Sequence, residues 1–187
     1  MLFNFMVTGM NFKIKYGNLI KEEATFIVNA SNTELTLGSG VSKAFSEHCG
    51  GSSYQHDLYE LKKSIGVIEQ GGVVISSSGS ATNFKYALHI AVMNYNNKTE
   101  TPYPTYSQIQ SALESVLIIV EDKIISEKIQ NPKLVIPLLG CGVGGLKKEK
   151  VFLMIKSMFK KTKVDFEVII YFHNKKDYYM FASKGIQ

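Results

Sequence analysis

Two kinds of hydrophobic pattern alternate along the chain. Largely apolar runs, typical of strands covered on both faces, occur at residues 24–30 and 133–139, and residues 165–172 predict another strand. Shorter apolar or alternating stretches predict further strands at 11–16, 71–76 and 86–95. In the intervening segments apolar residues recur at helical spacing, which predicts helices over 41–48, 53–65, 105–129, 148–161 and 175–184.

This order of elements defines the expected fold class. Apolar strands that alternate with helices are typical of α/β domains. We therefore expect three layers: a central mixed, mostly parallel sheet with helices on both faces. A length of 187 residues suits one domain. We place it over residues 11–187 and expect residues 1–10 to form a poorly ordered extension.

Composition limits the class of protein and the compartment that we expect. The chain is 45% hydrophobic and 20% charged, as in ordinary globular proteins. No apolar run approaches the ~20 residues of a membrane helix, and the N-terminus lacks signal-peptide features. We therefore expect a cytoplasmic protein without a membrane partner, in which Cys49 and Cys141 are reduced thiols. The cysteines and histidines match no metal-binding spacing, so we predict neither a metal nor a cofactor.

The charge pattern limits how an anion can be held. The net charge is +5, and all 21 basic residues are lysines. Without arginine, the planar fork that reads guanine and grips phosphate is missing, which disfavours sequence-specific DNA binding. Backbone amides, helix N-termini or lysine ammonium groups must then bind any anionic ligand.

Two glycine-rich turns offer such amides. Residues 38–41 and 140–145 each follow an apolar strand and precede a predicted helix. Parallel strands of an α/β sheet end at one edge, so the turns are candidates to lie side by side and grip a diphosphate. Asn29 and Asn32 are expected at the mouth of the first turn, where amides can pair with ribose hydroxyls. The alternative is that these glycines only shape turns.

Four stretches carry a resemblance to a known family. The run GNLIKEEATFIVNASNTELTLGSGVSKAF resembles the opening of macrodomains, which are ADP-ribose-binding modules. YALHIAV resembles their central histidine-bearing strand, VIPLLGCGVGG their second phosphate loop, and VIIYFHNKK their last strand and adenine edge. The likeness extends over residues 11–182.

The resemblance implies a role for each matching position. Asn18, Phe172 and Asn174 fall at the adenine edge, with Phe172 placed to cover the ring. Asn32 falls near the distal ribose, and the two glycine turns fall on the diphosphate. The implied ligand-binding residues are Asn18, Leu19, Asn29, Asn32, Gly38, Ser39, Gly40, Val41, Ser42, Gly140, Cys141, Gly142, Val143, Gly144, Phe172 and Asn174. Asn32 and Ser42 are the candidate catalytic residues.

Three positions depart from the family pattern. Asn18 replaces an aspartate that contacts adenine, which predicts weaker adenine binding. Gly144 replaces an aromatic residue that covers the distal ribose in many members, which predicts a more open cleft. Ser42 stands where hydrolytic members often carry an aspartate, and a serine without a partner cannot act as a base near neutral pH. The resemblance still allows hydrolysis, because some active members lack this aspartate and use a water held by the substrate's own phosphate.

Three functions remain open at this point. The first is hydrolysis of ester-linked mono-ADP-ribose from proteins, or removal of acetyl from O-acetyl-ADP-ribose. The second is a non-catalytic module that binds ADP-ribose, a related nucleotide or an ADP-ribosylated protein. The third is weak binding of RNA or poly(ADP-ribose) through the lysines of residues 147–163.

Other reactive side chains favour structural roles. His89 lies in an apolar strand and is expected to be a hydrogen-bonded core residue. His48 is expected to point away from the cleft, and Cys141 is expected to be a small loop residue rather than a nucleophile.

Overall fold

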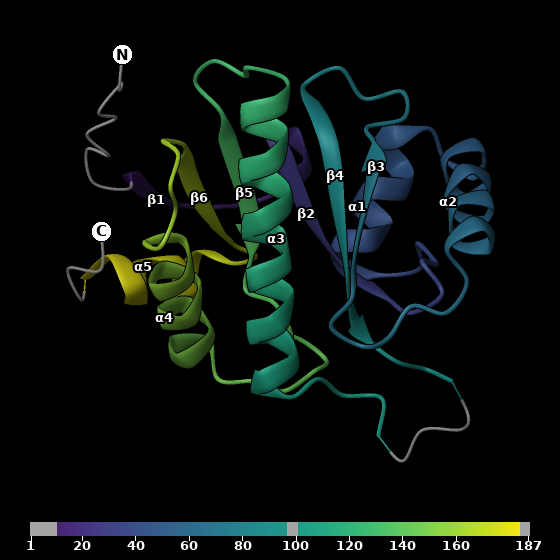
Figure 1. Cartoon of the computed structure of the whole chain (residues 1–187). Helices are drawn as coiled ribbons and strands as arrows, with labels where there is room; N and C mark the ends of the chain where they lie inside the picture. Colours follow the sequence, from purple (N-terminus) through teal and green to yellow (C-terminus); the bar gives the residue numbers. More distant parts are fainter. Residues whose placement is uncertain (1–10, 97–100, 184–187) are drawn as a thin grey trace.

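A computed structural model describes residues 11–96 and 101–183 of the chain. The predicted extension over residues 1–10 lies outside the described residues. Six strands form one sheet in the order β1-β6-β5-β2-β4-β3 (Figure 1). The strands are β1 Asn11–Tyr16, β2 Ala24–Asn32, β3 Val73–Ser77, β4 Phe84–Met93, β5 Lys133–Pro137 and β6 Glu167–Phe172. Neighbouring strands are parallel except for β3, which pairs antiparallel with β4 at one edge.

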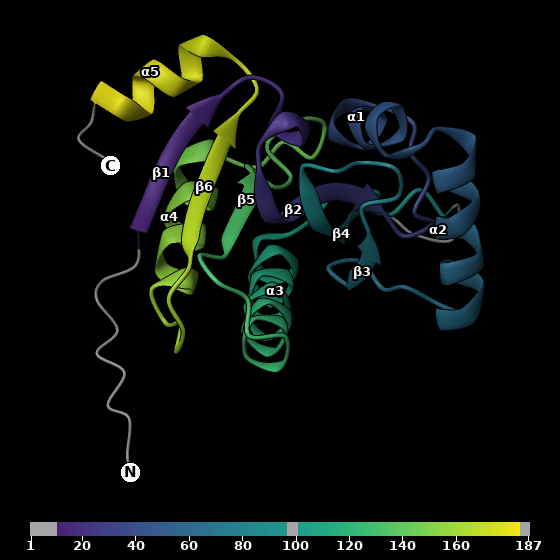
Figure 2. The same cartoon turned by 90° about the horizontal axis from the view of Figure 1, so that it is seen from above.

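Helices cover both faces of this sheet, which confirms the predicted three-layer α/β fold (Figures 1 and 2). The helices are α1 Gly40–Cys49, α2 Ser52–Ile65, α3 Tyr106–Ser126, α4 Lys148–Phe159 and α5 Lys175–Ser183, with a short 3-10 helix, η1, at Leu19–Lys21. Among the described helices, none is long and apolar enough to cross a bilayer.

The alternation of side chains along β2 explains the two cores. Phe26 and Val28 pack into a core with residues of α3, α4 and α5. Ile27 points to the other face and packs with residues of η1, α1 and α2. Successive side chains of a strand point to opposite faces, so a run that is apolar at every position builds a core on each side.

Local signals set the helix ends. Thr105 and Gln108 form a capping box at the start of α3, in which Gln108 N donates to Thr105 Oγ1 and Thr105 N donates to Gln108 Oε1. The prediction that this helix reaches residue 129 is wrong: α3 ends at Ser126, and Lys128 adopts a left-handed φ of 51°. That conformation cannot continue a right-handed helix.

Parallel pairing aligns the ends of the central strands. Strands β2, β4, β5 and β6 end at Asn32, Met93, Pro137 and Phe172. These ends meet at one edge of the sheet, where α/β proteins bind their ligands. The loops that follow them form the site described below.

Candidate functional site

A cleft of about 1210 Å³ lies at the carboxyl ends of the strands. Residues from four stretches of chain line it: 17–19 before η1, 30–44 after β2, 137–144 after β5 and 171–177 after β6. Val92, Met93 and Tyr95 at or just after the end of β4 also line it, as do Glu47 of α1 and Lys148 of α4. The two glycine turns therefore face one cleft, as their positions after buried strands predict.

Asn32 closes the loop that leaves β2. Its Oδ1 accepts from the backbone amides of Glu34 at 3.0 Å and Thr36 at 3.2 Å. Its Nδ2 donates to the carbonyl oxygen of Thr36 at 3.1 Å. An amide group has two lone pairs and two N–H donors, so one N–H of Asn32 remains for a ligand.

The first glycine turn opens α1 towards the cleft. Gly40 has a φ of 55°, in the left-handed region that favours glycine. A Cβ at Gly38 or Gly40 would meet nothing within 4 Å, so the space above the turn is free. Ser39 makes no side-chain cap on α1, and the first turn of α1 has no acidic residue. The first backbone amides of α1 and the positive end of its helix dipole are thus available to an anion.

A buried polar network supports this turn from behind. Ser42 Oγ lies 3.0 Å from Asn29 Oδ1 and 3.1 Å from the carbonyl oxygen of Ala30. Asn29 Nδ2 lies 3.0 Å from Nδ1 of His89, its register partner on β4. Because the Ser42 hydroxyl has a single proton and both neighbours are acceptors, it donates to this network and links α1 to β2.

Asn29 is therefore not at the mouth of the turn, and that prediction is wrong. Its side chain is fully buried and does not line the cleft. Asn29 shares the strand face of Ile27, beneath α1, because the two residues are two positions apart on β2.

His89 completes the network as a neutral core residue, as predicted. Its Nε2 lies 2.9 Å from Ser76 Oγ and 3.2 Å from the Tyr54 hydroxyl. Burial lowers the pKa of His89 to about 3. His48 pairs with Asn83 at 2.7 Å and does not line the cleft, which also agrees with its prediction.

The second glycine turn is tightly packed. Leu146 N donates to the carbonyl oxygen of Gly140 at 3.0 Å, and Gly140 has a φ of 70°. A Cβ at Gly144 would lie 2.6 Å from the Gly140 carbonyl oxygen and 2.9 Å from Pro104 Cδ. Packing thus requires glycine at position 144, and Pro104 occupies the space where a side chain would begin.

Cys141 is a packed residue of this turn. Its Sγ lies 3.6 Å from the carbonyl oxygen of Leu139. Burial raises the pKa of the thiol to about 12. The protonated thiol is the weakly nucleophilic form, and the role of Cys141 as a small loop residue stays a prediction.

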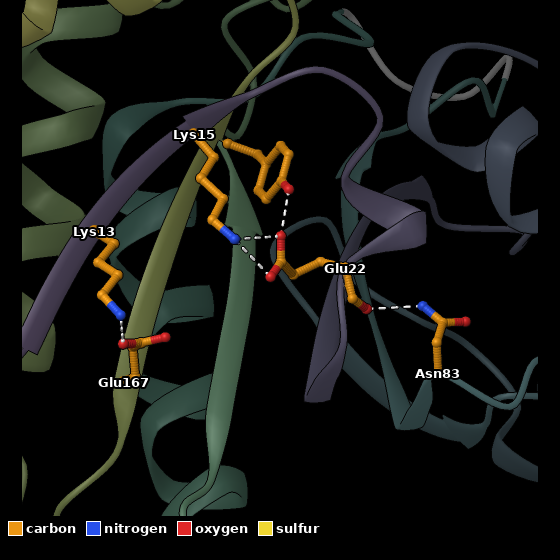
Figure 3. Close-up of polar contacts among 6 residues, drawn as sticks. Lys13, Lys15, Glu22, Asn83 and Glu167 are labelled. Atoms are coloured by element: carbon orange, nitrogen blue, oxygen red, sulfur yellow. Dashed lines mark hydrogen bonds and ion pairs between the residues drawn. The ribbon is translucent and has the colours of Figure 1, made fainter.

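Near the β6 end of the cleft, the carboxylate of Glu22 bonds to Lys15 of β1 and Tyr171 of β6. Glu22 binds Lys15 Nζ at 2.7 Å, and its backbone carbonyl oxygen accepts from Asn83 Nδ2 at 2.7 Å (Figure 3). The Tyr171 hydroxyl donates to Glu22 Oε2 at 2.5 Å. Burial raises the pKa of Glu22, but the hydrogen bonds from Lys15 and Tyr171 and the charge of Lys15 outweigh it and lower the pKa overall. Glu22 thus ties the chain after η1 to β1 and β6.

The sequence prediction that Phe172 covers a ligand ring is wrong. The side chain is only 1% exposed and packs between Phe181, with ring centroids 4.8 Å apart, and Phe152. Phe172 is the last residue of β6 and faces the core beneath α4 and α5.

Polar side chains at this end form hydrogen bonds within the protein. Asn174 Oδ1 accepts from Asp177 N at 2.9 Å, and its Nδ2 donates to Asp177 Oδ2 at 2.8 Å. Lys148 donates to the same carboxylate oxygen at 2.7 Å and lowers the pKa of Asp177. Asn18 Oδ1 accepts from Ile20 N at 3.3 Å, which starts η1.

Comparison with known proteins gives a family. The sequence profile of the Macro domain matches residues 28–155, which include both glycine turns. The chain belongs to the macrodomain family. A protein of Sulfurisphaera tokodaii is 26% identical to this macrodomain over 175 residues, or 91% of this chain and 88% of the relative.

Solved macrodomains share the fold. A variant of the Oceanobacillus iheyensis macrodomain, determined with ADPR, superposes with a TM-score of 0.75 at 18% identity and covers 96% of this chain and 94% of its own. The Trypanosoma brucei macrodomain in complex with ADP-ribose gives a TM-score of 0.72 at 15% identity and covers 95% of this chain and 69% of its own.

All of the predicted ligand-binding residues of the macrodomain except Asn29 line the cleft. Their contacts with a ligand remain predictions. Sequence reasoning missed several polar and aromatic residues that also line it: Thr33, Glu34, Thr36, Lys43, Glu47, Tyr95, Lys148, Tyr171, His173 and Asp177. Tyr95 could have been suspected, because it lies two residues after the end of β4. The Lys148–Asp177 pair could not have been predicted, because it joins α4 to α5 and no local sequence pattern marks it.

The lysine-rich segment is partly committed to contacts within the fold. Besides the pair of Lys148 with Asp177, Lys150 Nζ lies 3.7 Å from the centroid of the Tyr106 ring. Lys156 lies over the rings of Phe12 and Phe152, and burial lowers its pKa. These contacts account for part of the basic surface by packing.

Proposed function

We propose that this macrodomain binds ADP-ribose in the cleft at the carboxyl ends of its strands. One observation carries the proposal: two glycine turns, each leading towards a helix, face the same cleft. Their backbone amides and the uncapped start of α1 suit a diphosphate. The solved macrodomains of similar fold that are named with ADPR or ADP-ribose support the choice of ligand.

The cleft suggests an orientation for the ligand. The diphosphate lies between residues 38–42 and 140–144. The adenine lies at the β6 end, beside Asn18. The Asn18 Oδ1 already accepts a hydrogen bond from Ile20 N of η1, which leaves its second lone pair for the base. The second ribose lies at the Asn32 end and receives the remaining N–H of that amide.

Hydrolysis at the second ribose is the catalytic form of this proposal. The cleft of about 1210 Å³ exceeds the roughly 300–1,000 Å³ of ordinary small-molecule sites, so an ester group and a water fit beside the nucleotide. Water would cleave the ester of a mono-ADP-ribosylated protein or of O-acetyl-ADP-ribose into ADP-ribose and a carboxylic acid. Asn32 would orient the ribose, and the glycine turns would hold the diphosphate and water in place.

Binding without turnover is the alternative, and the geometry of Ser42 favours it. The hydroxyl is directed at Asn29 and Ala30, so it supplies no base for the attacking water. A turnover assay on mono-ADP-ribosylated protein and on O-acetyl-ADP-ribose separates the two forms. Release of ADP-ribose that scales with enzyme concentration supports hydrolysis, and stable binding without release supports a reader of ADP-ribosylated protein.

Calorimetric titration with ADP-ribose and with ADP tests the ligand. Wild type is expected to bind both, and Asn32→Ala is expected to lose about tenfold in affinity for ADP-ribose, the worth of roughly one hydrogen bond. ADP lacks the second ribose, so its affinity is the internal control. If the variant loses both ligands equally, the substitution has reshaped the loop over residues 33–36 and the assignment of Asn32 to the ribose fails.

Weak polyanion binding through the lysines is a separate proposal. It predicts binding of RNA or poly(ADP-ribose) that falls steeply with salt and survives Asn32→Ala. Binding that disappears with Asn32→Ala belongs to the cleft instead.

A further inference from the structure

Tyr95 is an exposed tyrosine in a cleft whose other Tyr and Phe side chains are engaged within the fold. Its side chain is 58% exposed and lines the cleft two residues after the end of β4. The two other Tyr or Phe residues in the lining are Tyr171, whose hydroxyl is bonded to Glu22, and Phe172, which is packed in the core. Among the described Tyr and Phe residues of the cleft, Tyr95 alone has a largely free ring.

The backbone on both sides of Tyr95 is fixed. Asn94 N donates to the carbonyl oxygen of Pro102 at 3.0 Å. Asn94 Oδ1 accepts from Asn96 N at 3.0 Å and from Thr33 Oγ1 at 3.3 Å. The ring is therefore carried on a constrained turn, which lowers the entropy that a ligand must overcome to order it.

These bonds also fix which end of the cleft Tyr95 occupies. Thr33 directly follows Asn32, and Thr33 N donates to the carbonyl oxygen of Met93 at 3.0 Å. Tyr95 thus stands beside the loop that Asn32 closes. The second glycine turn cannot supply a ring at position 144, because its Cβ would strike the Gly140 carbonyl oxygen and Pro104.

We propose that the ring of Tyr95 covers the second ribose of ADP-ribose and so selects ADP-ribose over ADP. This inference rests on the proposed binding of ADP-ribose and adds the residue that sets the selectivity. A pentose presents an apolar C–H face that an aromatic ring can shield from water. Burial of on the order of 60 Å² of apolar surface corresponds to about a tenfold change in affinity.

Calorimetry on Tyr95→Ala and Tyr95→Phe tests this assignment with ADP-ribose and ADP as ligands. Tyr95→Ala is expected to bind ADP-ribose about tenfold more weakly and ADP as wild type does, and Tyr95→Phe is expected to retain the affinity for both. Tyr59→Ala is the matched control, because Tyr59 is 47% exposed on α2 and does not line the cleft.

The outcomes separate the two proposals. If wild type binds both nucleotides and Tyr95→Ala affects them equally or not at all, the role of Tyr95 is refuted while nucleotide binding stands. If wild type binds neither nucleotide, the proposed function fails and the role of Tyr95 fails with it. A loss in Tyr95→Phe as large as in Tyr95→Ala would assign the effect to the hydroxyl and overturn the ring contact.

Discussion

Replacing Gly144 by alanine should destabilise the second glycine turn. The new Cβ would lie 2.6 Å from the carbonyl oxygen of Gly140 and 2.9 Å from Pro104 Cδ. One of these atoms belongs to the backbone and the other to the rigid proline ring. Neither can rotate away as a flexible side chain could, so the turn must move. Overpacking of this kind costs about 1–3 kcal/mol. We therefore expect Gly144→Ala to lose about 2 kcal/mol in the free energy of unfolding.

Gly142 provides the matched control in the same turn. A Cβ there would meet nothing within 4 Å, and neither Gly142 nor Gly144 has a positive φ. Gly142→Ala should leave the free energy of unfolding unchanged or raise it by about 0.4–1 kcal/mol, because alanine restricts the unfolded chain. The two variants thus differ in the local packing of a single methyl group.

Urea unfolding of the two variants measures this difference. With the slope of the transition unchanged, Gly144→Ala should have a lower midpoint than wild type and Gly142→Ala should not. The thermal midpoint of Gly144→Ala should fall by about 4–8 °C for a loss of 2 kcal/mol in a domain of this size. Equal midpoints for the two variants would refute the claim that Gly140 and Pro104 pack too closely against Gly144 to admit a Cβ.

Three further predictions concern the support of the cleft. Ser42→Ala leaves Asn29 Oδ1 without its donor and should cost about 1–3 kcal/mol in urea unfolding; no loss would mean that the network is not formed. The pKa of Glu22 is held below 4.5, so its stabilisation is present above pH 4.5 and is lost as the pH falls through the folded value. Glu22→Gln should therefore flatten this acid loss in unfolding curves, and an unchanged pH profile would contradict the role of Glu22. Asn18→Asp should tighten ADP-ribose binding about fivefold in calorimetry through a charge-assisted hydrogen bond, and an unchanged affinity would remove Asn18 from the base site.

The strands of this protein were largely predictable from its sequence. The run at 24–30 lies on strand β2, and the run at 133–139 covers β5 and two residues beyond it, because a strand buried on both faces is apolar at nearly every position. Helix η1 was missed, since three residues carry no periodic signal. The end of α3 was placed too late because Ile129 continues the apolar pattern after the left-handed Lys128 has ended the helix.

A strand that is apolar at nearly every position shows no alternation, so its sequence does not indicate which face of the sheet each residue occupies. Asn29 lies near the end of one such run and Phe172 ends another stretch, and nothing local shows that one lies beneath α1 and the other beneath α4 and α5. The glycine turns were predictable as parts of one site because parallel strands end together. The Tyr171–Glu22 contact joins residues 149 positions apart, so it follows only from the folded sheet.

The central claim is that both glycine turns hold one ADP-ribose. Titration of the ¹⁵N-labelled protein with ADP-ribose, followed by amide NMR, tests it most directly. Saturable shifts are expected that are largest at the amides of residues 38–42 and 140–144 and that share one binding curve. No saturable shift at millimolar ADP-ribose, or shifts confined to the lysines of residues 147–163, would contradict it.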